Sequence, residues 1–369
     1  KNKPDKFDIY IQRNKISSDS VSASVMFSTN SGETQEISLF ILNFPEEKIR
    51  LDYNVEDAEY DYVNDRLILL SDSYSHFIEI YDLQEDKFHR IELNNYPYHL
   101  SVSKDGDYAI AGIQSSTEYI SYINLNDLRF EGEFSVSYDV NDIVAAPDKM
   151  AYIFPRYNNN EIGKLNLSNG NFSAYQFNQI GDNLIAKLHP SGKYIYAVNN
   201  YSRLIKFDIR SAIPQLLYST SSYDMDNKLW LSKDGTEIFT KNKKILHIDP
   251  TLQGDDITSV SNLTFADNYL YFIEQSSLFD EYYLITTNNY YSSSHSESDR
   301  ILVYNSNFAQ DRIINLEKFY YIQQGQHSYS FADASAEYVF SSSDGSKIIV
   351  VSMSAFNYYD NWGIEIIEK

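Results

Sequence analysis

The sequence predicts an all-β fold, a single β-propeller made of four-stranded blades. Three observations support this prediction. A phrase of two apolar strands joined by a tight turn recurs along the chain. The turns are spaced by about 40 to 45 residues, which is the period of such blades. No stretch keeps the spacing of apolar residues that is typical of a helix.

The two strands and their tight turn are the most regular part of the repeat. Asp-Gly between alternating apolar runs is a strong hairpin signal, because glycine adopts the positive φ angle that such turns require. Clear copies occupy residues 100–111, 229–239 and 338–351, and a copy with Ser-Gly occupies residues 186–198. Weaker copies turn near Asp65, Asp148 and Asp267.

A third and a fourth strand follow each hairpin. The third strand ends in a short recurring phrase, such as Ile-Tyr-Asp-Leu at residues 80–83 and Tyr-Ile-Asn-Leu at residues 122–125. The fourth strand is weaker, for example at residues 88–93. Four strands joined in this order make one propeller blade.

The number of blades depends on how the first part of the chain is used. Seven units follow residue 53, beginning near residues 57, 98, 140, 184, 228, 261 and 337, and the last has only three clear strands. Residues 1–53 hold enough apolar runs for a first blade, so strand counting slightly favours eight blades over seven. In the seven-bladed alternative, residues 48–53 supply the missing outer strand and residues 1–45 form an added sheet. Either way, residues 1–369 are expected to form one propeller domain, with the seven units in residues 54–369.

Composition excludes several classes of function. The net charge of −22 argues against nucleic acid as the main partner, because binding phosphates needs clustered Lys and Arg. The absence of cysteine excludes disulfides and thiolate chemistry. No apolar run reaches the roughly 18 residues of a transmembrane helix. The polar start at residues 1–6 lacks a Met and an apolar signal region, so we expect a removed leader and an extracytoplasmic location, periplasmic or at the cell surface.

The sequence of one unit resembles that of a known repeat family. Residues 192–209 combine a Gly-Lys turn, the strand Tyr-Ile-Tyr-Ala-Val, an Asn-Asn pair and a strand that ends near Asp208. This unit resembles the YVTN-type propeller repeat, and the units around Asp105 and Asp234 resemble it more weakly. The resemblance implies a propeller of the kind common in bacterial extracytoplasmic proteins, often a binding scaffold. WD-repeat propellers are the runner-up family, with Tyr-Asp, Phe-Asp or Ile-Asp here in place of their Trp-Asp.

The two faces of a propeller differ in their loops. The tight turns lie on one face, here called the turn face. The connections between the second and third strands lie with the inter-blade connections on the opposite face, the long-loop face, where function is expected. Residues 275–299 form an insertion in this loop position, and residues 356–363 occupy the same position in the last unit. Aromatic residues of these two loops are candidates for a platform that binds a sugar ring or a protein anchor: Tyr282, Tyr283, Tyr290, Tyr291, Tyr358, Tyr359 and Trp362. Alternatively, these tyrosines pack along an extra hairpin against the rim.

No motif identifies a catalytic residue, a metal ligand or a cofactor. His99 and His189 fall on or next to inner strands, where a hydrogen-bonded core histidine is expected. We therefore expect a non-enzymatic binding or scaffold propeller that recognises a protein or carbohydrate ligand through its long-loop face. The alternative is a lactonase-like propeller hydrolase with a site at the mouth of the central channel. Such an enzyme would need several carboxylates and a His or Arg to meet there.

Overall fold

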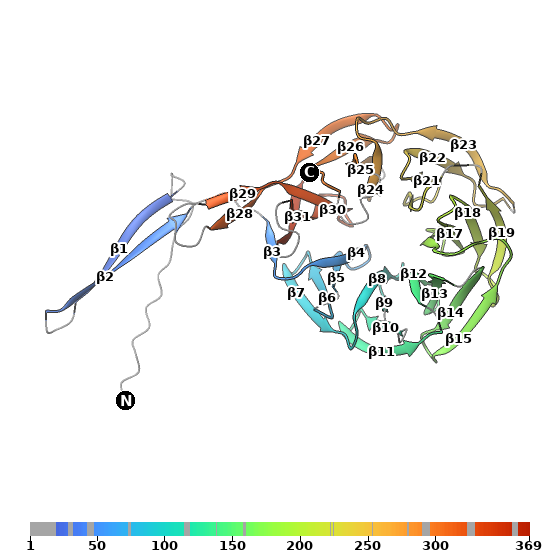
Figure 1. The fold of residues 1–369 in the computed structure, drawn as a ribbon, viewed down its shortest axis with the longest axis horizontal. Helices are drawn as coiled ribbons and strands as arrows, with labels where there is room; N and C mark the ends of the chain where they lie inside the picture. Colours follow the sequence, from blue (N-terminus) through green and yellow to red (C-terminus); the bar gives the residue numbers. More distant parts are fainter. Residues whose placement is uncertain are drawn as a thin grey trace.

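The computed structural model describes residues 20–28, 32–42, 48–72, 75–113, 119–137, 139–157, 160–221, 223, 225–252, 254–278, 280–289, 296–322, 329–355 and 361–369. Within these ranges the regular elements are all strands, which confirms the all-β prediction. Seven four-stranded antiparallel sheets stand around a ring in chain order (Figure 1). No helix of membrane-spanning length and hydropathy occurs in this described part of the chain.

Six of the blades are made of four consecutive strands each. Blade 1 holds β4 (Val55–Asp61), β5 (Arg66–Ser71), β6 (Phe77–Asp82) and β7 (Lys87–Glu92). Blade 2 holds β8 (Pro97–Val102), β9 (Tyr108–Ile113), β10 (Tyr119–Asn124) and β11 (Arg129–Ser135). Blade 3 holds β12 (Val140–Ala146), β13 (Met150–Pro155), β14 (Glu161–Asn166) and β15 (Asn171–Gln176). Blade 4 holds β16 (Ile185–Leu188), β17 (Tyr194–Val198), β18 (Leu204–Asp208) and β19 (Gln215–Thr220). Blade 5 holds β20 (Leu229–Leu231), β21 (Glu237–Thr240), β22 (Lys244–Ile248) and β23 (Ile257–Asn262). Blade 6 holds β24 (Tyr269–Gln275), β25 (Glu281–Thr287), β26 (Arg300–Asn305) and β27 (Gln310–Asn315).

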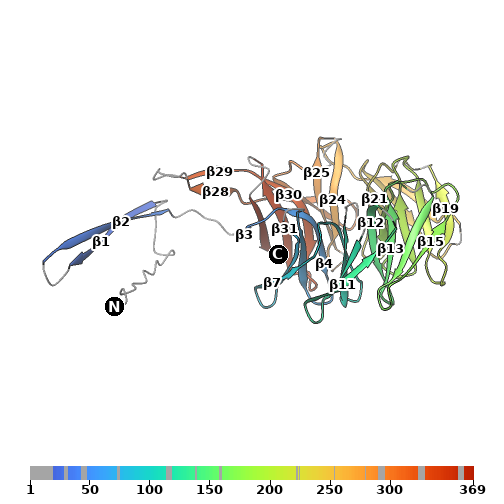
Figure 2. The ribbon, with the colours of Figure 1, turned by 60° about the horizontal axis from the view of Figure 1, so that its bottom comes forward.

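Blade 7 joins the two ends of the ring. It holds β30 (Ala334–Ser341), β31 (Lys347–Ser354) and β32 (Trp362–Glu368), and its outer strand is β3 (Ile49–Leu51) from the other end of the chain. Two further hairpins lie outside the ring, β1 (Ser20–Ser28) with β2 (Thr34–Leu42), and β28 (Phe319–Ile322) with β29 (Tyr329–Ala332) (Figure 2). The second of these is inserted between blades 6 and 7.

The preference for eight blades is therefore wrong, and the seven-bladed alternative describes the ring. Strand β3 pairs antiparallel with β32, with Leu51 opposite Trp362 and Ile49 opposite Ile364. Before β3, the described residues hold one hairpin, β1–β2, and not the four strands of a blade. The unit expected to begin near residue 261 begins at β24, since residues 257–262 form the outer strand of blade 5.

Burial follows strand position within each blade. The second and third strands are covered on both faces by the neighbouring blades, and they are rich in Ile, Leu, Val and Tyr, as two-sided burial requires. Strand β17 is buried along its whole length. The outer strand β15, which borders solvent, alternates between exposed and half-buried residues. This gradient gives one apolar layer between each pair of blades.

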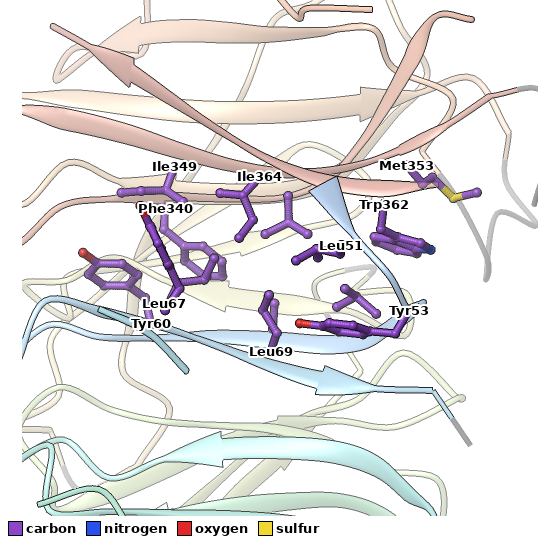
Figure 3. Packing of buried hydrophobic residues seen from close by; sticks show 14 of the residues in the cluster. Leu51, Tyr53, Tyr60, Leu67, Leu69, Phe340, Ile349, Met353, Trp362 and Ile364 are labelled. Carbon is purple, nitrogen blue, oxygen red and sulfur yellow. The ribbon is translucent and has the colours of Figure 1, made fainter. Parts of the chain in front are cut away.

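The layer between blades 7 and 1 is the one that closes the ring (Figure 3). Leu51 and Tyr53 lie beside Trp362, and all three side chains are buried within one cluster. Behind them, the ammonium of Lys48 lies 2.5 Å from the carboxylate of Glu365, and both groups are shielded from solvent. Residues 48–53 thus contribute a strand, an apolar contact and a buried ion pair to blade 7.

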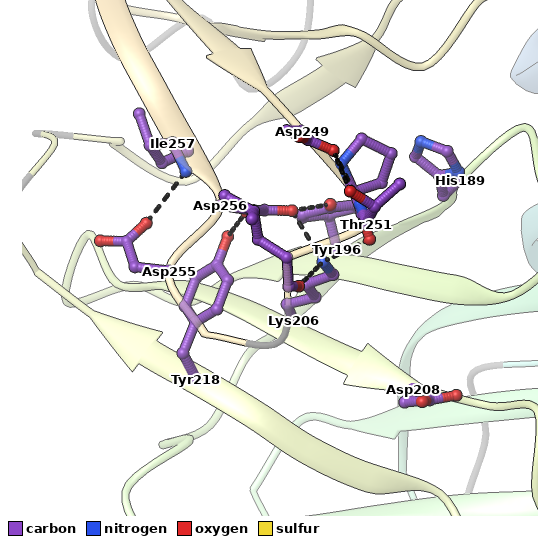
Figure 4. Close-up of polar contacts among 12 residues, drawn as sticks. His189, Tyr196, Lys206, Asp208, Tyr218, Asp249, Thr251, Asp255, Asp256 and Ile257 are labelled. Atoms are coloured by element: carbon purple, nitrogen blue, oxygen red, sulfur yellow. Dashed lines mark hydrogen bonds and ion pairs between the residues drawn. The ribbon is translucent and has the colours of Figure 1, made fainter.

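A polar network links blades 4 and 5 (Figure 4). The ammonium of Lys206 lies 2.7 Å from the Asp256 carboxylate, and neither side chain has any exposed surface. Tyr196 and Tyr218 both donate their hydroxyls to the same carboxylate, the latter at 2.7 Å. Because two charges without solvent need such partners, each member of the network depends on the others.

The turn face is built from tight hairpins that touch across blades. Gly235, in the turn of blade 5, has a φ of +74°, and a Cβ added there would lie 2.4 Å from Nε2 of His189. His189 donates from this nitrogen to the Gly235 carbonyl at 3.0 Å, while its Nδ1 accepts from the Ser191 amide. The expectation of a hydrogen-bonded core histidine is confirmed at this position.

Shortening the chain tests the closure. A chain that begins at residue 54 loses β3, Leu51 and Tyr53, and it leaves Glu365 without Lys48. We expect a loss of more than about 4 kcal/mol in the free energy of unfolding, since removing one large buried apolar side chain already costs about 2 to 5 kcal/mol. A chain that begins at residue 46 keeps all these groups and should unfold at nearly the same urea concentration as the full chain. Equal stability of the two shortened chains would contradict closure by β3.

Substitutions in the polar network test the coupling of blades 4 and 5. Asp256→Ala leaves the Lys206 ammonium buried without a counter-charge, and breaking such a pair costs about 3 to 5 kcal/mol. The control is Asp249→Ala, a nearby carboxylate that accepts hydrogen bonds from Thr251 at the surface. We expect Asp249→Ala to leave the thermal midpoint nearly unchanged. Similar midpoints for both variants would show that the network adds no stability.

Candidate functional site

The innermost strands of five blades carry a bulge at the same level. The pairing register shifts within β4, β8, β12, β24 and β30, close to the long-loop face. A bulge leaves one residue unpaired and re-aims the side chains around it. The residues placed at these shifts are Glu56, Tyr98, Asn141, Tyr271 and Glu337. Four of the five line a cavity at the centre of the ring.

This central cavity has a volume of about 510 Å³. Its walls come from the innermost strands of six blades, so it lies on the axis of the ring near the long-loop face. The size falls in the range of about 300 to 1,000 Å³ that is usual for small-ligand sites. The charged and aromatic groups of the lining are Glu56, Asp57, Tyr98, His99, Lys187, Lys228, Trp230, Tyr271, Phe272, Glu337, Tyr338 and Trp362.

Two aspartates tie neighbouring innermost strands together. Asp57 accepts the amide of Ala58 with one oxygen and the amide of Leu100 in blade 2 with the other, both at 2.9 Å. Asp142 repeats the arrangement from blade 3 to blade 4. Burial raises the pKa of Asp57 to about 7 and that of Asp142 to about 6. Since both oxygens of each carboxylate are occupied, these groups hold the wall in place.

Lys187 is the cation that compensates this side of the cavity. Its ammonium lies 3.1 Å from Glu59, one level deeper in the channel. The charge of Glu59, followed by those of Asp142 and Asp57, raises the Lys187 pKa above its ordinary value. The lysine is therefore charged at neutral pH and opposes the rise in pKa of the two aspartates.

The ring of His99 is part of the cavity lining. Burial, with the nearby charges of Arg156 and Lys187, lowers its pKa to about 4, so the ring is neutral at physiological pH. Its Nε2 is buried and has no hydrogen-bond partner among the described residues. The expectation of a hydrogen-bonded core histidine is thus wrong for His99, although it holds for His189.

The opposite wall combines a lysine with a tyrosine and a carboxylate. The Lys228 ammonium lies 4.6 Å from the centre of the Tyr271 ring. The Tyr271 hydroxyl donates to Glu337 at 2.5 Å. Among the described residues Lys228 forms no ion pair, and burial lowers its pKa. The wall therefore presents ammonium protons, an aromatic face and a carboxylate to one space.

Toward the turn face the channel narrows. A second space of about 260 Å³ continues past Asp57 and Lys187 and is bounded by Tyr62 and Glu274. The Tyr62 hydroxyl donates to Glu274, and the Lys233 ammonium lies 3.8 Å from the Tyr62 ring centre. These contacts cross from blade 1 to blades 5 and 6. The larger cavity lies on the long-loop side of these contacts.

The predicted aromatic platform is only partly described. Tyr282 and Tyr283 lie in β25, are 3% and 0% exposed, and pack into the layers between blades. Trp362 begins β32, is 5% exposed and contributes to the cavity wall. Residues 275–299 are not one loop, because β25 runs through them. The remaining platform candidates lie outside the described residues: Tyr290, Tyr291, Tyr358 and Tyr359.

Sequence reasoning missed three exposed tyrosines on the long-loop face. Tyr157 and Tyr201 lie between the second and third strands of blades 3 and 4 and are 68% and 66% exposed. Tyr96 lies between blades 1 and 2 and is 45% exposed. The position of Tyr201 in the repeat could be predicted from the sequence, because this residue follows the Asn-Asn pair after a predicted second strand.

Replacing Lys187 tests the electrostatics of the cavity. The pKa of Asp57 is about 7 in the folded protein, whereas its ordinary value is about 4. The free energy of unfolding therefore falls as pH rises between these two values. Lys187 offsets this effect only where the aspartates are ionised. Lys187→Met should therefore lower the urea midpoint more at pH 8 than at pH 5. The exposed Lys193→Met in the same blade is the control, with equal effects at both values. Equal losses for Lys187→Met would contradict the assignment.

Comparison with known proteins identifies the fold. No family model and no curated protein matches the chain. The β-propeller domain of Cps50 (Swd1) from Myceliophteria thermophila aligns with a TM-score of 0.61 at 14% identity, covering 86% of this chain and 97% of that one. Hydrazine synthase from Kuenenia stuttgartiensis aligns with a TM-score of 0.57 at 13% identity, covering 87% and 97%. At these identities the similarity establishes a β-propeller fold and carries no activity.

Proposed function

We propose that this protein is a non-enzymatic binding propeller that recognises a protein or a glycan at the central cavity of its long-loop face. The observation that carries the proposal is the cavity of about 510 Å³, in which aromatic side chains, carboxylates and lysine ammonium groups converge. Convergent polar groups among aromatic walls are typical of a ligand site. The sequence predicts a further contact surface at Tyr290, Tyr291, Tyr358 and Tyr359, which lie outside the described residues, and we keep it as part of the proposal.

The acid–base properties of the cavity favour binding over the lactonase-like alternative. An efficient general base has a pKa near the working pH and lies within reach of the substrate. Asp57 has a suitable pKa, about 7, but each of its oxygens accepts a backbone amide, and these bonds fix the carboxylate in the wall. The pKa of His99, about 4, makes it a weak base, and its Nε2 is buried. Neither group combines the two properties.

The YVTN-type resemblance supports the same proposal. Propellers of this kind often serve as binding scaffolds outside the cytoplasm, and the propeller fold is shared with this chain. We propose an extracytoplasmic location on that resemblance.

Histidine resonances can report binding by any member of a panel of small probes. The folded protein is screened by NMR against mono- and disaccharides and against dipeptides. A probe that binds should shift the ring resonances of His99 and leave those of His189, on the turn face, unchanged. Lys228→Met and Tyr98→Ala should each weaken that probe by about tenfold, the cost of one good contact. A bound probe that leaves His99 unshifted would place the site elsewhere and overturn the proposal.

A further inference from the structure

We infer that the ligand is an uncharged carbohydrate chain, and that Tyr157 and Tyr201 bind its sugar rings beyond the one held in the cavity. This inference rests on the proposed function and names the ligand class of the same site. It follows from three features: the charge balance of the channel, the contacts that link the cavity wall to the loops of the two tyrosines, and the kind of apolar group exposed on the long-loop face.

The charged groups of the channel are balanced in sign. Lys187 pairs with Glu59 at 3.1 Å, and Lys233 pairs with Glu274 at 2.7 Å. Two charged groups of the cavity lining, Glu56 and Lys228, form no ion pair among the described residues, and their charges are opposite. A ligand of one charge would be attracted by one of these groups and repelled by the other. A sugar hydroxyl, in contrast, can donate to the carboxylate and accept from the ammonium, so one neutral ring can use both.

Arg156 lies between the cavity wall and Tyr157, and hydrogen bonds join the loops of the two tyrosines. The Arg156 charge acts on His99 in the cavity wall, and its guanidinium lies 6.0 Å from the Tyr157 ring centre. At the other end of that loop, the Asn160 amide donates to the Gly181 carbonyl at 3.1 Å. The neighbouring Ile180 carbonyl accepts from Asn199 at 2.8 Å, two residues before Tyr201.

These bonds fix the loops that carry Tyr157 and Tyr201 to one another. Asn199 also accepts the Tyr201 amide at 2.9 Å, which holds the backbone of that tyrosine in place. The Tyr201 ring passes 3.6 Å from the position a Cβ of Gly181 would take, and this glycine has a φ of +74°. The closest atom to that position is Nδ2 of Asn199 at 2.7 Å, so the absence of a side chain at residue 181 leaves room for the amide that joins the two loops.

The exposed apolar groups of the two faces differ in chemistry. In the described residues of the long-loop face, the large exposed apolar side chains of the ring loops are tyrosines: Tyr96, Tyr157 and Tyr201. The exposed aliphatic side chains of the inter-strand turns lie on the turn face: Val63, Ile213, Leu252 and Leu278. A protein partner generally needs a contiguous apolar core, whereas a sugar chain needs separate aromatic faces with polar groups between them. The long-loop face has the second pattern.

Chain length provides the test. Binding to the full chain is measured by calorimetry for cello-, malto- and chito-oligosaccharides from disaccharide to hexasaccharide. In one of these series affinity should rise at least about tenfold with length, because each added ring that stacks on a tyrosine contributes a contact. Tyr157→Ala and Tyr201→Ala should each lower the affinity for the long members by about tenfold and leave the disaccharide within about twofold. Ile213→Ala, 60% exposed on the turn face, is the matched control and should change neither.

The outcomes separate this inference from the proposed function. If a disaccharide shifts His99 but longer chains bind no more tightly, the tyrosines are not subsites and the inference fails while the function stands. If only dipeptides shift His99, the carbohydrate class is wrong and the function again stands. If no probe shifts His99, both fail. Loss of the thermal transition in Tyr157→Ala or Tyr201→Ala would show that these tyrosines support the fold instead.

Discussion

The pairing of β3 with β32 is the constraint on which the rest of the molecule depends. Each blade buries its two faces only when it has a neighbour on both sides, so an open ring would leave two apolar layers exposed to water. Residues 49–51 close that gap from the far end of the chain. Leu51 completes the layer beside Trp362, and Lys48 neutralises Glu365 at 2.5 Å. The ring is thus fastened by a contact between residues more than three hundred positions apart in the chain.

Closure also creates the central cavity, where we propose that a ligand binds. Only in a closed ring do the innermost strands of six blades converge on one space, and the bulges at their ends turn polar side chains into it. Placing charges in such a space is costly unless they are compensated. Asp57 and Asp142 are compensated by backbone amides and Lys187, and Glu337 by the Tyr271 hydroxyl. The cavity wall is therefore stable without a ligand, while His99 keeps one nitrogen unpaired.

The sequence predicts the local parts of this structure well and the long-range parts poorly. Asp-Gly turns encode their hairpins through short-range geometry, so the blades around Asp105, Asp234 and Asp344 were predictable. The partner of residues 49–51 is set by ring closure, which no local pattern records, and strand counting therefore gave one blade too many. Tyr282 and Tyr283 were predicted to lie in a loop because residues 275–299 form a long segment. The alternation that is typical of a strand is not visible there, because tyrosines lie on both faces of β25. One feature of the cavity wall is visible in the sequence. Val-Glu-Asp at residues 55–57 and Val-Asn-Asp at residues 140–142 are similar motifs at the same bulge in two blades.

The difference between the two faces supports our proposal that a ligand binds at the long-loop face. On the turn face the polar groups near the axis are committed to contacts between blades: Tyr62 with Glu274, Lys104 with the Pro190 carbonyl, and His189 with the Gly235 carbonyl. A ligand there would have to replace contacts that hold the ring together, and the cost would appear as lost stability. On the long-loop face, Nε2 of His99 is unpaired, and the rings of Tyr157 and Tyr201 are open to water. Side chains that make no contact needed for folding can bind a partner without unfolding the protein. Contacts that stabilise the ring therefore lie at one end of the strands, and groups available for recognition lie at the other end.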